Sequence, residues 1–404
     1  MARPSSNLPA RRRRWPWVLA MVGAAFATVI LVLMVDAYSA LGSKPSGAHL
    51  DRISRSPNYQ DGRFRNTLPT VSDGLSWTTF RDFLLGGSDY RQPSVEIPVH
   101  TPAPHDPDLS APSLRVTWLG HSTLLIELDG SRILVDPVWG PRASPSRFVG
   151  SRRFYDPPLA LEDLPPIDAV VISHDHYDHL DLPTVRALAS RVRQWLVPLG
   201  LGAHLEGWGV QSDKIREFDW WDEMPLGPVR VVSTPARHFS GRGLTDRDAT
   251  LWSGWAFLGS EARVWYSGDT ALTTQFHEIG ERLGPFDLTL IETGAYNESW
   301  TDVHLGPEQA VRAHQMVGGG LMVPVHWGLF DLALHGWTEP AERVRAAAAS
   351  SGVRVAFPRP GESLTLNEYP VEPWWPSLPW ETALEAPIIS TGLAESLNTN
   401  PIAQ

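Results

Sequence analysis

The stretch VVISHDHYDHLDL, residues 170–182, sets three histidines and three aspartates directly after an apolar run. Ionisable side chains are costly to bury beside a hydrophobic strand unless something compensates their charge. His174 and His176 are two residues apart, so in an extended chain their side chains point to the same side, and Asp178 and His179 follow where the chain turns. A solvated polar junction is the alternative, but its three imidazoles would repel one another on protonation. The stretch therefore predicts a divalent metal site where a buried strand ends.

Three more candidate ligands follow predicted strands further along the chain. They are His238 in VSTPARHFSGRG, Asp269 in VWYSGDTAL and His326 in LMVPVHWGLF. Loops at the ends of several strands can converge on one rim, so these side chains can meet. A single histidine such as His238 is more often a hydrogen-bonded structural residue, but the joint pattern favours a site for two metal ions.

The composition narrows the function classes. Of the 404 residues, 42% are hydrophobic and 20% are charged, which is typical of a globular protein. The net charge of -11 and the absence of a basic block in the later chain argue against nucleic acid as a partner, because phosphate binding requires a basic surface. The chain has no cysteine, so any metal must be held by imidazole and carboxylate. Zinc, iron and manganese all accept these ligands.

The N-terminus predicts a membrane anchor. Four arginines at positions 11–14 precede an uncharged stretch, and a helix over residues 17–35 would be about 28 Å long, close to the ~30 Å hydrocarbon core of a bilayer. We therefore expect a basic cytoplasmic N-terminus over residues 1–14 and a transmembrane anchor over residues 15–36. The arginines favour the cytoplasmic side, so the rest of the chain would lie outside the cytoplasm, on the periplasmic side.

A cleaved signal peptide is the alternative interpretation of this segment. Ala37 and Ser39 offer small residues to a signal peptidase. The apolar region is longer than the roughly 7 to 15 residues usual in such signals, which favours an uncleaved anchor.

The rest of the chain divides into three regions. Residues 37–112 predict an irregular leader that packs on the core, residues 113–367 predict a hydrolase domain, and residues 368–404 form a tail rich in proline and tryptophan. The domain begins with the β-rich runs LRVTWLG, STLLIELDG and SRILVDPVWG, and helical patterns then alternate with strands. The expected helices cover residues 182–191, 273–282, 307–316 and 339–349. This order predicts sheets covered by helices.

Taken together, the motifs resemble a known family. HDHYDH, a later histidine, a Gly-Asp turn and a last histidine are similar to the metallo-β-lactamase superfamily. Within it, the chain looks like the N-acylphosphatidylethanolamine-hydrolysing phospholipase D family. That closer resemblance rests on GRFRN, VTWLGHSTLLIELDGSRILVDPVW, HDHYDHLDLPT, GRG, YSGDT, IETGAY, DVHLGPEQAVRAH and PVHWGLFDLALHGWTEP. It covers about residues 58–358, so the anchor and the tail fall outside it.

The resemblance implies an α/β (α+β) fold, an αββα sandwich with a dinuclear zinc site between the sheets. Seven side chains would hold the two Zn²⁺ ions. They are His174, His176 and His238 for one ion, Asp178, His179 and His326 for the other, and Asp269 as a bridge between both. Motif position also assigns Tyr177 and His304 to contacts with the substrate headgroup, and Asp136 to orienting ligand histidines.

The expected chemistry follows from two neighbouring metal ions. Such ions lower the pKa of a shared water, so that a bridging hydroxide can attack phosphorus. Asp178, Asp269 and His304 are the expected catalytic residues, with His304 as a hydrogen-bond donor or general acid unless it is only a helix-edge histidine without a role. No serine nucleophile is predicted, because Ser122 in GHST lacks the G-x-S-x-G elbow, and the neighbouring His121 is expected to be structural.

The leading hypothesis is a membrane-anchored dizinc phosphodiesterase that cleaves N-acylphosphatidylethanolamine or related glycerophospholipids in the manner of a phospholipase D. A lactonase or another metallo-hydrolase of the same fold is the second hypothesis, since the metal ligands do not encode the scissile bond. A non-catalytic metal-binding or lipid-binding membrane protein is an alternative of another class. The expected partners are a phospholipid substrate and the membrane, and a homodimer is left open.

Overall fold

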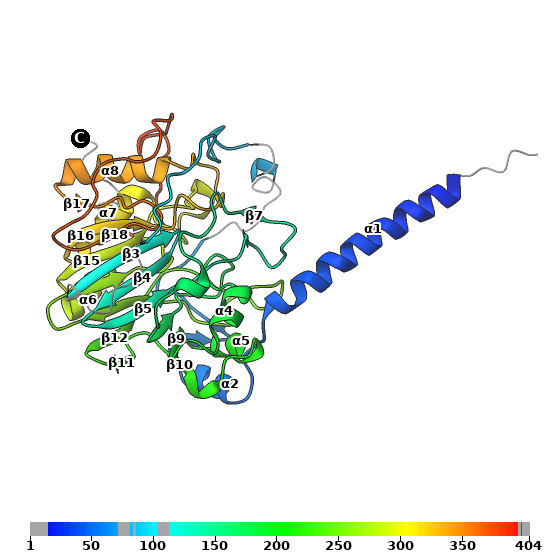
Figure 1. The fold of residues 1–404 in the computed structure, drawn as a ribbon, viewed down its shortest axis with the longest axis horizontal. Coiled ribbons are helices and arrows are strands. Elements are labelled where there is room, and N and C mark those ends of the chain that lie inside the picture. The colour runs from blue at the N-terminus through cyan, green and yellow to red at the C-terminus, as the bar shows by residue number, and fades with distance from the viewer. Residues whose placement is uncertain (1–14, 72–80, 84–85, 103–112, 395–396, 398–404) are drawn as a thin grey trace, which may run out of the picture.

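The core of the protein consists of two seven-stranded β-sheets that pack face to face, with helices on both outer faces (Figure 1). This computed structural model describes residues 15–71, 81–83, 86–102, 113–394 and 397. The basic segment predicted over residues 1–14 lies outside the described residues. The αββα architecture predicted from the sequence is confirmed.

The first sheet joins the early strands of the sandwich to one late strand. Its spatial order is β10 (Ile215–Phe218), β9 (Gln194–Pro198), β8 (Ala169–Val171), β5 (Ser131–Val135), β4 (Thr123–Leu128), β3 (Leu114–Gly120) and β18 (Ser363–Leu364). β5, β8, β9 and β10 pair in parallel, whereas β3 and β4 pair antiparallel. Every residue of β4 is buried, as expected for a strand covered on both faces.

The second sheet holds the later strands in nearly sequential order. It runs β11 (Glu223–Leu226), β12 (Val229–Thr234), β13 (Gly254–Leu258), β14 (Arg263–Tyr266), β15 (Phe286–Glu292), β16 (Gly319–Val325) and β17 (Arg354–Val355). The pairs from β11 to β14 are antiparallel, and those from β14 to β17 are parallel. The parallel half therefore needs crossover helices, which cover its outer face.

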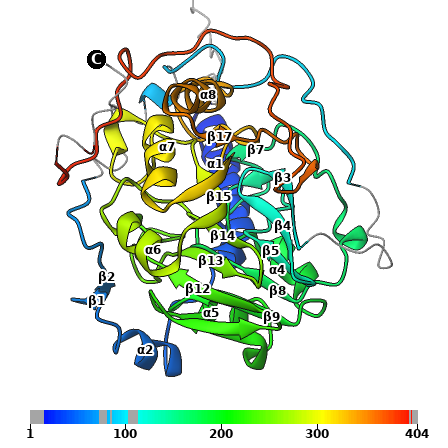
Figure 2. The ribbon, with the colours of Figure 1, turned by 90° about the vertical axis from the view of Figure 1, so that its left-hand side faces the viewer.

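Three layers of apolar side chains hold the sheets and helices together. Ile126 of the first sheet and Phe257 of the second belong to the main cluster between the sheets. A second cluster lies under α4 (Leu182–Leu188) and α5 (Gly202–Gly207), on the outer face of the first sheet. On the outer face of the second sheet lie α6 (Gln275–Leu283), α7 (Pro307–Met316) and α8 (Glu339–Ser351) (Figure 2).

The ends of these helices follow local signals. α7 spans the predicted residues 307–316. α4 ends at Leu188, before the predicted residue 191, because the chain turns there to enter β9. α6 begins at Gln275 rather than at residue 273, since Thr273 accepts a hydrogen bond from the Gln275 N–H instead of joining the helix. α8 extends past the predicted residue 349 and ends before Gly352, whose φ of 67° suits glycine.

The leader and the tail pack against the sandwich. In its described part, the leader contains regular elements that the sequence did not predict, among them α2 (Ala48–Ile53) and the pair of β1 (Tyr59–Gln60) with β2 (Arg63–Phe64). Phe64 is buried, and in the tail Trp375 is 5% exposed within the main core. The remaining short elements are β6 (Arg142–Ala143), β7 (Ser151–Arg152), η1 (Ser39–Leu41), η2 (Leu161–Asp163), η3 (Ser212–Lys214) and η4 (Glu298–Trp300).

The helix α1 (Trp15–Tyr38) projects away from the two sheets (Figure 1). An 18-residue stretch within Trp17–Leu41 has a mean hydropathy of 2.8, and none of that stretch is buried. Near the end of α1, Asp36 pairs with Arg147 of the sandwich at 2.8 Å. By length and composition α1 can cross a membrane, and an N-terminal signal sequence would have the same properties.

Candidate metal centre

The candidate ligands lie in loops that follow the carboxyl ends of strands. The loops come from both sheets and follow β3, β5 and β8 in the first and β12, β14 and β16 in the second. These strands run in one direction within each sheet, so their carboxyl ends form a common edge. The seven predicted ligands, which are far apart in the sequence, therefore gather at one place.

The first group of donors comprises His174, His176, His238 and Asp269. One ligand atom from each of these residues lies within 4.8 Å of the others. The His176 Nδ1 lies 2.8 Å from the His174 Nε2 and 3.3 Å from the His238 Nε2. The Asp269 Oδ2 is 3.7 Å from the His174 Nε2 and 3.8 Å from the His238 Nε2. Three imidazoles and one carboxylate thus converge, as a tetrahedral metal site requires.

The second group contains Asp178, His179 and His326. The Asp178 Oδ2 lies 3.4 Å from the His179 Nε2 and 3.3 Å from the His326 Nε2. The Asp269 Oδ2 also reaches these two nitrogens, at 3.2 Å and 3.0 Å. One oxygen of Asp269 therefore lies within 3.8 Å of imidazole nitrogens of both groups.

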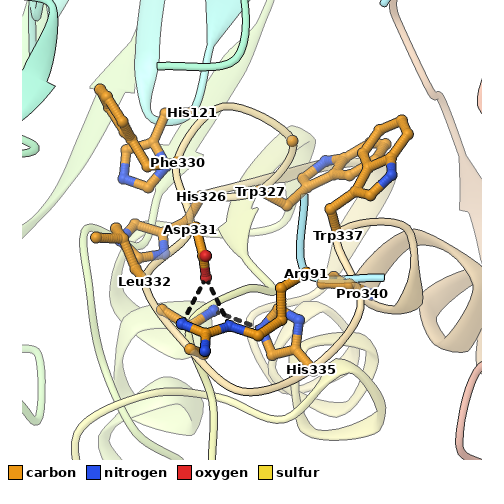
Figure 3. A pocket seen from close by; sticks show the side chains of 13 residues that line it. Arg91, His121, His326, Trp327, Phe330, Asp331, Leu332, His335, Trp337 and Pro340 are labelled. Atoms are coloured by element: carbon orange, nitrogen blue, oxygen red, sulfur yellow. Dashed lines mark hydrogen bonds and ion pairs between the residues drawn. The ribbon is translucent and has the colours of Figure 1, made fainter. Parts of the chain in front are cut away.

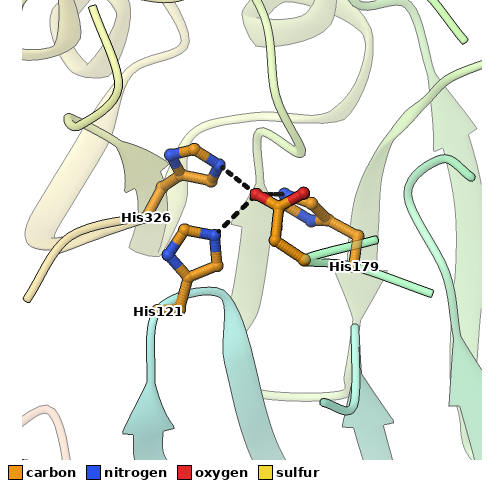
Figure 4. Close-up of side chains that lie close together, drawn as sticks. His121, His179 and His326 are labelled. Atoms are coloured by element: carbon orange, nitrogen blue, oxygen red, sulfur yellow. Dashed lines mark hydrogen bonds and ion pairs between the residues drawn. The ribbon is translucent and has the colours of Figure 1, made fainter. Parts of the chain in front are cut away.

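His121 joins the second group, although the sequence led us to expect only a structural residue there. It follows β3 with a φ of 51°, and its side chain is 2% exposed. Its Nε2 lies 2.9 Å from the Asp178 Oδ2. Figure 4 shows His121, His179 and His326 arranged around one carboxylate. The signal in the sequence was its position directly after the predicted strand LRVTWLG. The structure places the end of that strand at the same edge as the HDHYDH motif.

Asp136 lies directly behind the second group and is 0% exposed. Its Oδ2 accepts a hydrogen bond from the His179 Nδ1 at 2.7 Å, and also from the Ser173 and Tyr266 hydroxyls. Its Oδ1 accepts from the Ser173 N–H at 2.7 Å. Because its Nδ1 is bound in this way, His179 presents its Nε2 to the cluster.

The buried polar atoms at the centre fit a divalent cation. The His179 Nε2, both ring nitrogens of His326 and the Asp269 Oδ1 are buried and make no hydrogen bond of regular geometry among the described residues, although the two Nε2 atoms lie 3.0–3.4 Å from carboxylate oxygens. Buried polar atoms in proteins are almost always paired, and an unpaired one costs about 1–3 kcal/mol. Metal coordination would satisfy imidazole nitrogens and carboxylate oxygens together, so the residues present match the implied group.

The side chains by themselves also create opposing charges at this site. Burial and neighbouring imidazoles hold the pKa of His174 well below its ordinary value. Burial would lower the pKa of His326, but Asp269 and Asp178 raise that pKa to about 10. Burial would raise the pKa of Asp269, but His179 and His326 hold it well below its usual range. The carboxylates thus attract cations, and a metal ion would displace the protons that His179 and His326 otherwise hold.

The two residues predicted to contact substrate flank the cluster. His304 is partly exposed, with its Nδ1 3.9 Å from the Asp269 Oδ2 and 2.7 Å from the Glu292 Oε2. Tyr177 is half-buried, and its hydroxyl donates a hydrogen bond to the Arg242 carbonyl oxygen at 2.5 Å. The Arg242 guanidinium lies 4.0 Å from the centre of the Tyr177 ring. Burial raises the pKa of Tyr177 to about 12, so this phenol stays neutral.

Sequence reasoning also missed Glu292 and Arg242. Glu292 is the last residue of β15 and is 0% exposed. A carboxylate at the end of the apolar run FDLTLIE was the available signal, because a buried acid requires a partner. Arg242 lies in the GRG motif, whose contact with Tyr177 depends on tertiary structure alone.

The leader closes one side of the cluster. A cavity of about 20 Å³ lies beside His121 and His326, and the Arg91 Nε donates to the Asp331 Oδ1 at 3.0 Å across it (Figure 3). Such a volume holds about one water molecule. Elsewhere around the cluster, His176 and Tyr177 are partly exposed.

Known proteins resemble this chain over most of its length. Residues 131–327 match the model of a beta-lactamase superfamily domain. An uncharacterized protein of Mycobacterium tuberculosis is 47% identical over 360 residues, which cover 87% of this chain and 95% of that protein. N-acyl-phosphatidylethanolamine-hydrolyzing phospholipase D 1 of Caenorhabditis elegans is 37% identical over 271 residues, covering 64% of this chain and 76% of the relative.

A solved structure supports the same fold. The isothiocyanate hydrolase from Delia radicum gut bacteria superposes with a TM-score of 0.51 at 20% sequence identity. The match covers 62% of this chain and 98% of that enzyme. At this identity the likeness concerns the fold alone.

Proposed function

The chain belongs to the metallo-β-lactamase superfamily, and on that premise we propose that it is a metal-dependent phosphodiesterase of the phospholipase D type. Its substrate is N-acylphosphatidylethanolamine or a related glycerophospholipid, and the bond that breaks joins phosphorus to the headgroup oxygen. One observation carries the proposal: the Asp269 Oδ2 lies 3.0 Å from the His326 Nε2 and 3.7 Å from the His174 Nε2. A carboxylate between two groups of imidazoles is suited to bridging two metal ions.

The metal ions are proposed to be two zinc ions, with iron or manganese as alternatives for the same donors. His174, His176 and His238 would hold one ion, and Asp178 and His179 with His326 the other. When bound, the two ions would lower the pKa of a water molecule and neutralise the charge that develops on the phosphoryl oxygens. We propose that His121 orients the Asp178 carboxylate, because its Nε2 lies 2.9 Å from the Asp178 Oδ2.

The protein's own groups bind the substrate and guide the proton. His304 and Tyr177 flank the open side of the cluster and would contact the phosphate or the headgroup. His304 would give a proton to the leaving oxygen, since it is partly exposed and stands 3.9 Å from Asp269. The Arg91–Asp331 pair would limit access to the cluster from the side of the leader.

The substrate class rests on two observations of different kinds. The relative from Caenorhabditis elegans is named for the hydrolysis of N-acylphosphatidylethanolamine. The helix α1 would keep the enzyme at a lipid surface as a single-pass anchor, with the N-terminus in the cytoplasm and the catalytic domain on the periplasmic side. We also propose the division into a leader (37–112), a hydrolase domain (113–367) and a tail (368–404), and we leave a homodimer open.

The test is an activity screen of the full chain in detergent, reconstituted with zinc. A panel of phospholipids that includes N-acylphosphatidylethanolamine is offered beside a panel of lactones, and lipid products are identified by mass spectrometry. We expect phosphatidate and an N-acylethanolamine from the wild type, and losses above ~10²-fold for Asp269→Asn and His176→Ala because each removes a metal ligand.

The outcomes separate the alternatives. Hydrolysis of lactones alone would replace the phosphodiesterase with a lactonase. Stoichiometric metal without turnover of either panel would indicate a metal-binding or lipid-binding membrane protein. Full activity of Asp269→Asn would contradict a bridging carboxylate. Elemental analysis of the purified protein distinguishes zinc from iron and manganese.

A further inference from the structure

Glu292 is a buried carboxylate beside the seven proposed ligands, and one of its oxygens lies within 4.8 Å of ligand atoms of Asp269, His304 and His326. It is 0% exposed and ends β15, the strand beside the Asp269 loop. Its Oε1 accepts hydrogen bonds from the backbone N–H groups of Thr270, at 2.5 Å, and Leu305, at 3.2 Å. Its Oε2 lies 2.7 Å from the His304 Nδ1. One carboxylate thus holds the residue after Asp269, the residue after His304, and the His304 ring.

These contacts decide which nitrogen of His304 faces the open side. In its ionised form Glu292 can only accept, so the His304 Nδ1–H is then the donor of this hydrogen bond. The Nε2 has no hydrogen-bond partner within the described part of the chain, and the His304 side chain is 13% exposed. The Nε2 is therefore the atom that meets a ligand. A carboxylate behind the ring also fixes the orientation of the imidazole, as in a catalytic triad.

We propose that Glu292 is a positioning residue that holds His304 as the proton donor to the leaving headgroup oxygen. The inference rests on the phosphodiesterase activity proposed above. As the bond between phosphorus and the headgroup oxygen breaks, its electron pair goes to that oxygen, which takes the proton from the His304 Nε2. The attacking water forms the new bond to phosphorus and releases a proton to solvent, and His304 takes up a proton again before the next turnover.

An amide at position 292 cannot replace the carboxylate. If the oxygen of Glu292→Gln accepts from the Thr270 and Leu305 N–H groups, its NH₂ group faces the His304 Nδ1. His304 must then accept at Nδ1 and carry its proton on Nε2 as a neutral ring, which is a poor acid. If the amide turns over, its NH₂ group faces the two backbone donors instead. Either orientation loses the arrangement that makes His304 an acid.

The experiment compares two leaving groups on one phosphoryl group. The substrates are short-chain phosphatidate esters of p-nitrophenol, which leaves without a proton, and of an N-acylethanolamine, whose oxygen needs one. General acid catalysis contributes ~10²–10⁴-fold, so we expect Glu292→Gln to lose that factor in kcat on the alkyl ester and less than ~10-fold on the aryl ester. The double variant with His304→Gln should be no slower than His304→Gln alone.

Two readouts besides activity accompany the kinetics. Metal content by elemental analysis should equal that of the wild type. ¹⁵N NMR of labelled histidine should show the Nδ1-H signal assigned through His304→Gln shifted or lost in Glu292→Gln, because neither orientation of the amide offers a charged acceptor. The matched control is Glu339→Gln in α8, a 3% exposed carboxylate that accepts from the Tyr296 hydroxyl at 2.7 Å. It should leave the ratio of the two rates unchanged.

The outcomes distinguish the two proposals. Equal losses on both esters, or an Nδ1-H signal unchanged in position, would overturn the role of Glu292 and leave the phosphodiesterase in place. A wild type that cleaves neither ester would remove the phosphodiesterase and this inference with it. If Glu292→Gln fails to fold, Glu292→Asp keeps the charge with a shorter reach, and its loss should still be larger on the alkyl ester than on the aryl ester.

Discussion

The buried ion pair of Arg237 and Asp302 connects the loops of the candidate metal centre to the leader and to the tail. Arg237 precedes His238, and its Nη2 lies 3.0 Å from the Asp302 Oδ1, with side chains that are 1% and 0% exposed. Arg237 also donates to the Thr391 carbonyl oxygen in the tail at 3.1 Å. Asp302 accepts the Val71 N–H of the leader at 2.9 Å and the Thr391 N–H at 2.8 Å. Removing Asp302 therefore disturbs three segments at once.

We predict that Asp302→Ala lowers the free energy of unfolding by about 3–5 kcal/mol, because it leaves a guanidinium buried without its counter-charge. The matched control is Glu223→Ala. Glu223 pairs with Arg230 at 2.8 Å, but the two side chains are 50% and 49% exposed. Exposed pairs contribute about 0–1 kcal/mol, so the control should change little. Adding Arg237→Met to Asp302→Ala should restore part of the loss, since the unpaired charge is then gone.

The assay is pulse proteolysis in urea on the full chain in detergent, at fixed metal concentration because bound ligands shift apparent stability. Limited proteolysis in the absence of urea should also cut the tail near Thr391 sooner in Asp302→Ala than in the control. An Asp302→Ala protein as stable as Glu223→Ala would refute the reasoning. The buried ion pair would then contribute no more to the free energy of unfolding than an exposed ion pair does.

Further predictions concern the site and the core. Asp136→Asn should weaken metal affinity by ~10–100-fold, measured by chelator competition, because His179 loses the carboxylate that orients it. Chelation should lower the free energy of unfolding by about 2.7 kcal/mol relative to protein with metal at 100 times its dissociation constant. Trp375→Ala should cost about 3–5 kcal/mol in urea, because this 5% exposed ring packs 5.3 Å from Trp327. Burial lowers the pKa of His335 to about 4, so the neutral ring contributes its full share to the free energy of unfolding above pH ~6.5. That contribution should fall as the pH drops towards 4, and the fall should be shallower in His335→Gln.

Each of these predictions has an outcome that contradicts it. Unchanged chelator competition would show that Asp136 does not orient a ligand, and an unchanged urea midpoint after chelation would mean that metal does not favour the folded state. A loss below ~1 kcal/mol for Trp375→Ala would place that ring outside the core. For His335 the critical bond is the Ala295 N–H, which donates to its Nε2 at 3.1 Å, and parallel pH curves for wild type and variant would contradict its role.

Local pattern made much of this protein predictable. The spacing of HDHYDH, the strands from LRVTWLG onward, the bounds of α7 and the apolar length of α1 are all properties of neighbouring residues. Periodicity and capping act over a few positions, so the sequence carries them directly. The seven candidate ligands were also visible, because each follows a strand and the carboxyl ends of parallel strands share an edge.

The sequence by itself determined the fold class, the types of metal donor and the apolar N-terminal helix. Only the tertiary structure decided that His121 turns into the second donor group, that Glu292 holds His304, and that Arg237 and Asp302 tie the leader and the tail together. These contacts join residues that are far apart along the chain or lie in different loops. They depend on how two sheets pack and on which nitrogen of a ring is already bound, and neither property has a period or a spacing that a sequence can display.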